Sequence, residues 1–249
     1  MNRYKFHKAF ATQGPVVLPV IHVVSVKRTL DNIDVAIDAG APGCFLINHD
    51  FGVDAFLPII RDVRAAHPSW WMGVNFLGVT GRDAFPILAQ LQTSDCRFDA
   101  YWADDARIDE RSVSQCEAKA IAAVRDNTIW RGLYFGGVAF KKQRTVAAGN
   151  YKSAAAAGVA FMDVVTTSGV ATGLQADLSK ISAFRSGIAD HTMALASGIT
   201  PDNAEDYQDV DCFMVATGIN KPNNFYDIDP ARLVALLQVS KGIGEKNST

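Results

Sequence analysis

Eight short apolar segments, separated by helix-forming and polar sequence, constrain the fold of this chain more than any other feature. Most are β-branched or aromatic and apolar throughout, which is typical of parallel strands that are covered on both faces. The predicted strands are Val16–Val24, Gly43–Ile47, Trp71–Phe76, Ala100–Ala103, Trp130–Phe135, Phe161–Thr166, Thr192–Ala196 and Asp211–Thr217. Helical spacing of apolar residues between the strands predicts helices over Asp31–Asp38, Ala55–Ala66, Ser112–Val124 and Pro230–Val239.

Repeated strand–helix units predict a parallel sheet, and eight of them in 249 residues predict a closed (β/α)8 TIM barrel. An open doubly wound sheet is the competing fold, but no G-x-G-x-x-G follows the first predicted strand. No Ser/Pro/Gly-rich linker or charge run divides the chain, so we expect a single domain. Residues 1–14 are predicted to form an N-terminal arm or barrel-bottom cover, 15–241 the barrel and 242–249 a flexible tail.

Composition argues against several classes of partner. The net charge of -2 gives no electrostatic basis for binding nucleic acid or an anionic membrane. No apolar run approaches the ~18 residues of a spanning helix, and the N-terminal residues lack the apolar stretch of a secretory signal. The 4 cysteines stand singly without C-x-x-C spacing. We therefore expect a cytoplasmic protein without a disulfide framework. The sequence is compatible with a homo-oligomer.

The last two predicted strands end in a pattern that favours anion binding. Ser197-Gly198 directly follows predicted strand seven, and Thr217-Gly218 lies at the end of predicted strand eight. Glycine lets the backbone approach a ligand, and unpaired amides favour an anion. TIM barrels often bind phosphate after strands seven and eight. With the similar Ser-Gly and Thr-Gly pairs after strand six, the predicted phosphate-binding residues are Ser168, Gly169, Thr172, Gly173, Ser197, Gly198, Thr217 and Gly218.

Polar residues also follow the other predicted strands, where TIM barrels carry their reactive groups. The predicted catalytic residues are His22, Asn48, His49, Asn75, Asp104 and Lys141. Imidazole, carboxylate and amine groups are suited to proton transfer, and a loop lysine is suited to an anionic ligand. Each also has a purely structural interpretation: a satisfied core histidine, a helix-capping loop, a backbone-bonding turn residue, a capping carboxylate or a solvated lysine.

Metal chemistry has weaker support. His22, His49, Asp50 and Asp104 could converge on a divalent ion, but the sequence contains neither H-x-H nor H-E-x-x-H spacing. We therefore predict no cofactor.

Five segments in the C-terminal third form a pattern in order and spacing: Asp163–Gly173 (DVVTTSGVATG), Ala176–Leu178, Ser197–Asn203, Val215–Gly218 and Asp229-Pro230. This pattern resembles the BtpA/SgcQ family, and Pro19–His22 and Gly73–Asn75 match that family more loosely. It implies a (β/α)8 barrel related to ribulose-phosphate-binding barrels. The chain departs from the family pattern after strand two (Asn48-His49-Asp50), after strand five and after strand eight (Thr217–Lys221). The predicted phosphate-binding residues are thus better retained than the reactive ones.

Two functional hypotheses follow. The first is an enzyme that binds a phosphorylated sugar or nucleotide-type small molecule, with isomerase, lyase or N-ribosyl-cleaving chemistry at the barrel mouth. The second is a catalytically inactive barrel that acts as a ligand-binding, assembly or regulatory protein, which the altered ends of strands two and five favour.

Overall fold

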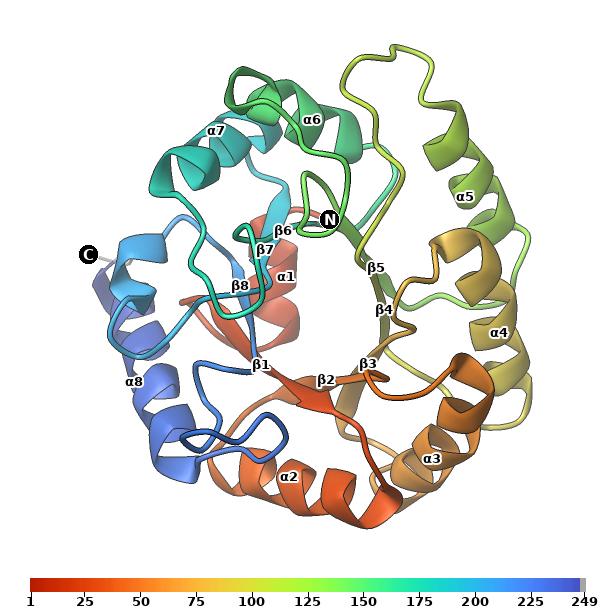
Figure 1. The fold of residues 1–249 in the computed structure, drawn as a ribbon, viewed down its shortest axis with the longest axis vertical. Helices are drawn as coiled ribbons and strands as arrows, with labels where there is room; N and C mark the ends of the chain where they lie inside the picture. Colours follow the sequence, from red (N-terminus) through yellow and green to blue (C-terminus); the bar gives the residue numbers. More distant parts are fainter. Residues whose placement is uncertain (247–249) are drawn as a thin grey trace.

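A computed structural model describes residues 1–246 and shows a closed eight-stranded parallel barrel, with the strands in sequence order and helices around them (Figure 1). The strands are β1 (Val16–His22), β2 (Gly43–Ile47), β3 (Trp71–Asn75), β4 (Ala100–Ala103), β5 (Leu133–Gly137), β6 (Val164–Thr167), β7 (Thr192–Leu195) and β8 (Cys212–Val215). Strand β1 pairs with both β2 and β8, which closes the barrel. The predicted TIM-barrel fold is confirmed.

The helices follow the strands in alternation, except between β7 and β8. They are α1 (Arg3–Ala9), α2 (Val26–Asp38), α3 (Val53–Ala66), α4 (Gly81–Thr93), α5 (Cys116–Asp126), α6 (Tyr151–Gly158), α7 (Leu178–Ile188) and α8 (Pro230–Lys246). Only a 3-10 turn, η2 (Ala204–Tyr207), connects β7 to β8. Residues 242–246, predicted as part of a flexible tail, belong to α8, and residues 247–249 lie outside the described residues.

Strands β5 and β6 each begin three residues later than predicted. Trp130 is apolar and buried, but its indole nitrogen donates to the Phe98 carbonyl at 3.1 Å and its ring stacks on Phe85 of α4. It therefore packs beneath the helices rather than in the sheet. Apolar sequence alone does not separate these two kinds of burial.

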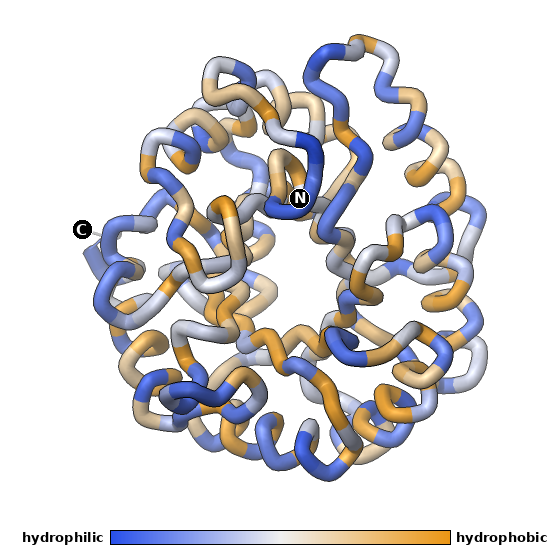
Figure 2. Tube along the Cα trace, in the orientation of Figure 1, coloured by the Kyte–Doolittle hydropathy of each residue, from blue (hydrophilic) through white to orange (hydrophobic). Residues whose placement is uncertain are grey.

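Two apolar cores result from the alternation of side chains along the strands. One lies between the strands and the helices, and the other fills the barrel interior with residues such as Phe45, Trp102 and Phe135. Gly73 leaves room for the Phe45 ring, which a Cβ at that position would overlap. Figure 2 shows hydrophobic residues along the central strands, whereas hydrophilic residues concentrate in loops and outer turns. Among the described residues, no helix is both long and apolar enough to cross a membrane.

A repeated ion-pair motif holds the N-terminal ends of the strands. An aspartate directly precedes each of β4, β6 and β8 and accepts a hydrogen bond from the start of the preceding strand (β3, β5 or β7). Each aspartate also pairs with an arginine of the helix that leads into that preceding strand (α3, α5 or α7). The aspartates are Asp99, Asp163 and Asp211. The backbone donors are the amides of Met72, Tyr134 and Met193, at 2.8 to 2.9 Å. The arginines are Arg64, Arg125 and Arg185, at 2.6 to 3.0 Å.

The N-terminal segment covers this same end of the barrel. The carbonyl of Met1 accepts a hydrogen bond from the Thr192 amide at the start of β7. The Phe6 ring of α1 is fully buried and contacts Phe135 inside the barrel, and Arg3 pairs with Asp211 at 2.8 Å. The opposite, C-terminal end is therefore the open mouth.

Candidate functional site

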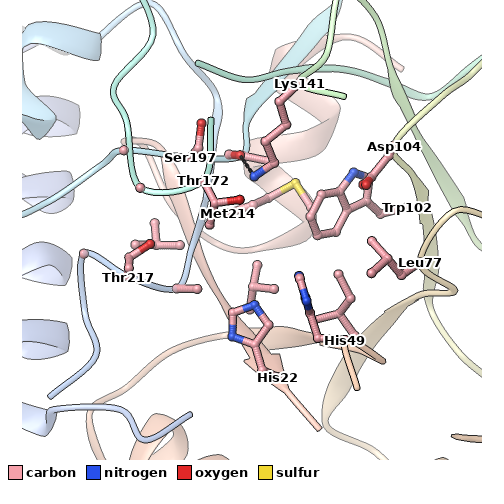
Figure 3. A pocket seen from close by; sticks show the side chains of 18 of the residues that line it. His22, His49, Leu77, Trp102, Asp104, Lys141, Thr172, Ser197, Met214 and Thr217 are labelled. Carbon is pink, nitrogen blue, oxygen red and sulfur yellow. Dashed lines mark hydrogen bonds between the residues drawn. The ribbon is translucent and has the colours of Figure 1, made fainter. Parts of the chain in front are cut away.

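A cavity at the C-terminal ends of the strands brings together most of the predicted site residues (Figure 3). Those that line it are His22, His49, Asp104, Lys141, Thr172, Gly173, Ser197, Gly198, Thr217 and Gly218. Titratable side chains from the loops after β1 to β5 occupy one side, and small residues from the loops after β6 to β8 occupy the other. The remaining predicted residues, Asn48, Asn75, Ser168 and Gly169, do not line this cavity.

His22 is held in one tautomer by the loop after β8. Its Nδ1 lies 3.1 Å from the Phe225 carbonyl, and its ring stacks on the Phe225 ring with centroids 3.9 Å apart. A carbonyl oxygen only accepts hydrogen bonds, so the proton must lie on Nδ1. Burial, reinforced by the nearby His49, lowers the pKa of His22 to about 4. At neutral pH the ring is therefore uncharged, and its Nε2 lone pair is free to accept a proton or a hydrogen bond.

His49 lies beside His22, with ring centroids 5.1 Å apart in an edge-to-face arrangement. Burial and the nearby Lys142 lower its pKa, while Asp50 and Asp104 act in the opposite direction. The two rings thus supply two uncharged imidazoles on one wall of the cavity at neutral pH.

Asp104 is the carboxylate of the cavity. Burial raises its pKa, partly offset by the hydrogen bond that Asn75 Nδ2 donates to its Oδ1 at 3.0 Å. Asn75 lies beneath the cavity wall, where its own Oδ1 is buried without a partner among the described residues. Asn75 therefore orients Asp104, and a carboxyl with a raised pKa is suited to exchange protons with a ligand.

Lys141 extends into the cavity from the loop after β5 (Figure 3). Its amide donates to Ser168 Oγ at 2.8 Å, and its Nζ has a long contact of 3.4 Å with the Ala196 carbonyl. Burial lowers the pKa of the amine, and Asp104 partly restores it. The loop that carries this lysine is thus anchored through the Lys141 backbone amide.

Three other predicted residues hold the loops of the mouth together. Asn48 Nδ2 donates to the Phe51 carbonyl at 2.8 Å, and its Oδ1 accepts from the Leu77 amide at 2.9 Å. Ser168 Oγ donates to the Gly169 carbonyl, and the Gly169 amide donates to Ser197 Oγ at 2.9 Å. The Gly169 amide, expected to face a phosphate, is therefore already used, and these residues are structural.

The backbone of the β7 and β8 ends remains open to an anion. Among residues 1–246, no protein group accepts a hydrogen bond from the amides of Gly198, Thr217 or Gly218. Gly198 and Gly173 have positive φ angles of 72° and 78°. Unpaired amides at a glycine-containing turn favour an anionic ligand.

Close packing of the loops explains why two of these residues are glycine. A Cβ at Gly198 would overlap the Gln175 backbone, and a Cβ at Gly218 would overlap the Ile199 carbonyl oxygen. The sequence pattern attributed this space to a ligand, but neighbouring loops fill it. Substitutions at these glycines would therefore disturb the loops themselves.

Several cavity residues were not predicted. Leu77, Trp102 and Met214 form the apolar lining, and Lys142 lies next to Lys141. The Trp102 indole nitrogen is buried without a partner among the described residues. Trp102 lies two positions before Asp104, so the alternation of side chains along a strand directs both to the barrel interior. The sequence could therefore have predicted Trp102 as a cavity residue. Phe225 comes from the β8–α8 loop, where no periodic pattern marks it.

No group of three or more His, Cys, Asp or Glu within residues 1–246 is arranged to hold a metal ion.

No model of a known protein family matches this chain, and no curated protein matches it. Solved structures similar in fold include a 2-keto-3-deoxy-6-phospho-gluconate aldolase from Zymomonas mobilis, with a TM-score of 0.60 and 15% identity over 95% of this chain and 96% of that one. Another is a phosphoribosyl anthranilate isomerase from Thermus thermophilus, with a TM-score of 0.57 and 12% identity over 89% and 96%. At such identities the likeness shows a shared TIM-barrel fold alone, and the resemblance to the BtpA/SgcQ family stays a prediction.

Proposed function

We propose that this protein is an enzyme that binds a small phosphorylated substrate and carries out isomerase or lyase chemistry on it. The observation that carries this proposal is the two-sided cavity. Unpaired amides of Gly198, Thr217 and Gly218 lie on one side, His22, His49 and Asp104 lie on the other, and the Lys141 amine reaches the Ala196 carbonyl beside the amides.

The phosphate is expected to occupy the side formed by the loops after β6 to β8. Amide donors and the hydroxyl of Thr217 there suit a phosphate. An anchored phosphate that does not react supplies binding energy and orientation for the reacting end of the molecule.

The opposite side supplies proton-transfer groups in complementary states. His22 offers an unprotonated Nε2 as a base, because burial keeps the ring neutral and the hydrogen bond to Phe225 places its proton on Nδ1. Asp104 has a raised pKa and so gives up or takes a proton more readily near neutrality. Isomerisation and C–C or C–N cleavage both need a proton moved between such groups. Two structural neighbours are named for phosphorylated substrates, which agrees with this assignment.

Binding of inorganic phosphate and of ribose 5-phosphate, measured by isothermal titration calorimetry, tests the phosphate side. Thr217→Glu places a carboxylate beside the unpaired amides, and Thr217 is exposed, so its side chain has room. We expect affinity for both compounds to fall at least ten-fold, which corresponds to about 1.4 kcal/mol.

Thr145→Glu is the matched control, because it adds the same charge to an exposed threonine outside the cavity. It should change affinity less than two-fold. Equal losses in both variants, or the absence of phosphate binding to the unmodified protein, would refute the phosphate site. Ribose without phosphate should bind at least ten-fold more weakly than ribose 5-phosphate.

A further inference from the structure

Two lysines near the mouth differ sharply in how their amines are satisfied. Lys180 Nζ donates to the carbonyls of Ala139 and Ser168, each at 2.7 Å, and does not line the cavity. Within residues 1–246, Lys141 Nζ makes one hydrogen bond, at 3.4 Å to the Ala196 carbonyl. Among the described residues, Lys141 has no carboxylate within ion-pair distance. Lys180 therefore stabilises the loops, whereas Lys141 leaves donor capacity unused inside a cavity.

The backbone holds the Lys141 amine inward. Its own amide is fixed to Ser168 Oγ, and the next residue, Lys142, adopts a φ of 64°, in the left-handed region. A non-glycine residue in that region costs conformational energy and marks a turn that the surrounding structure enforces. Gln143 secures the same turn by donating to the Asp104 and Gly137 carbonyls.

The surroundings of the amine favour its uncharged form. Trp102 and Met214 contribute apolar lining around it, whereas the Phe140 ring, whose centroid lies 5.6 Å from Lys141 Nζ, offers the ammonium only a weak cation–π contact. Burial is the main cause of the lowered pKa of Lys141. An uncharged lysine amine is a nucleophile toward carbonyl carbon, and desolvation is a common way to obtain one.

We propose that Lys141 is a catalytic nucleophile that forms an iminium with the carbonyl group of a phosphorylated aldehyde or ketone. This inference rests on the proposed function and deepens it by naming the reacting group of the substrate. The amine reaches the Ala196 carbonyl, one residue before Ser197-Gly198, so a short substrate whose phosphate lies at the unpaired amides has its carbonyl group within reach of Lys141 (Figure 3).

The step balances with the groups present. The Lys141 ammonium releases a proton to solvent, and the free amine attacks the carbonyl carbon, forming a C–N bond while the carbonyl electron pair moves to oxygen. The nitrogen passes one proton to that oxygen and protonated Asp104 donates a second, so the oxygen leaves as water. Asp104 then regains a proton from solvent, so that ammonium plus carbonyl give iminium plus water. The iminium then draws electrons from the adjacent carbon, and His22 Nε2 is placed to accept the proton released there.

Reductive trapping tests the proposal on the unmodified protein. The protein is incubated with dihydroxyacetone phosphate or glyceraldehyde 3-phosphate and sodium cyanoborohydride, whose hydride converts an iminium into a stable secondary amine. Peptide mass spectrometry then locates the adduct. We expect labelling at Lys141 to exceed labelling at Lys142 and Lys180 at least ten-fold, and an excess of inorganic phosphate to reduce it at least five-fold.

Variants make the outcome decisive. Lys141→Arg keeps the cation and should abolish the specific adduct, whereas Lys142→Arg should retain it. Labelling of Lys141 no stronger than that of Lys142 would overturn the iminium, even if phosphate compounds bind in calorimetry, and the proposed phosphate site would then stand alone. Strong labelling of Lys141 that inorganic phosphate does not reduce would support the iminium and count against the phosphate site.

Discussion

The two ends of the barrel treat charge in opposite ways. At the N-terminal end, three aspartates are each paired with an arginine and a strand amide, and Asp211 is fully buried between Arg3 and Arg185. At the C-terminal mouth, Lys141 and Asp104 line one cavity without an ion pair to any described residue. The first end uses charge to fix the strands, and the second leaves charged groups available for a ligand.

This difference separates stability from function within one fold. A buried ion pair with further hydrogen bonds is expensive to break, because the remaining partner loses its compensation. An unpaired buried group costs stability while the site is empty, and such groups are typical of sites that bind or react. Substitutions at the N-terminal end should therefore lower the free energy of unfolding, whereas substitutions in the cavity should mainly change ligand binding or reactivity.

The largest expected effect is at Asp211. Asp211→Asn keeps an acceptor for the Met193 amide but leaves Arg185 and Arg3 without their counter-charge. We expect the free energy of unfolding to fall by about 3–5 kcal/mol, measured by urea denaturation at pH 7.

Asp105→Asn is the matched control, since it removes the same charge from a half-exposed pair with Arg107. That loss should stay within about 1 kcal/mol. Similar losses in the two variants would show that the ion pairs at the N-terminal end are not the fixed points inferred here.

The next effect concerns pH and His22. Its pKa is about 4 in the folded protein against 6.5 as the ordinary value, so the unfolded chain takes up a proton first as pH falls. Burial of neutral His22 therefore costs no stability above pH 6.5. As pH falls from 6.5 to 4, the free energy of unfolding decreases, and below pH 4 this effect does not grow further. At about 1.4 kcal/mol per pKa unit, the total is about 3 kcal/mol.

Nitrogen NMR of the imidazole measures this directly. Nδ1 should carry the proton across neutral pH, and the ring should titrate near pH 4. The difference in unfolding free energy between the unmodified protein and His22→Gln should narrow between pH 7 and pH 4.5. Titration of His22 near pH 6.5 would contradict the buried, neutral state.

Much of this arrangement can be predicted from the sequence, because side chains alternate between the two faces of a strand. His22, His49 and Asp104 each lie two positions beyond an interior residue of their strand, namely Val20, Ile47 and Trp102. The same period assigns Asn48 to the other phase, which explains why it binds backbone instead of lining the cavity. Strand order and closure follow from the eightfold repeat.

Other features depend on contacts between segments far apart in the chain. Phe225 stacks on His22 from a loop with no periodic signal, and Gly218 is required by the Ile199 carbonyl of another loop. Lys141 and Lys180 are the same residue type, and only their hydrogen-bond partners distinguish them. The Lys180 amine is held by loop carbonyls, whereas the Lys141 amine has donors left for a ligand. Local sequence cannot report such partners.

These two lysines allow a paired test of intermediate size. Lys180→Met leaves the Ala139 and Ser168 carbonyls without their donor and should lower the free energy of unfolding by about 2 kcal/mol. Lys141→Met loses one long contact and removes the desolvation cost of its amine, so we expect no loss beyond about 0.5 kcal/mol, or a small gain. Thermal and urea unfolding of both variants give the comparison, and a larger loss for Lys141→Met would mean that its amine is structural.

The smallest effect should come from an ion pair on the outer surface of the mouth. Arg28 Nε and Asp227 Oδ1 lie 2.7 Å apart and connect α2 to the loop that carries Phe225, but the Arg28 side chain is 38% exposed. Water already solvates such a pair, so Arg28→Met should reduce global stability by about 0.5–1 kcal/mol at most. Because Asn32 separately binds the Tyr226 carbonyl and the Ile228 amide, the loop should remain closed. Hydrogen exchange of the Ile228 amide should therefore accelerate less than ten-fold. A greater acceleration would show that this exposed pair, unlike others at the surface, controls the loop that sets the His22 tautomer.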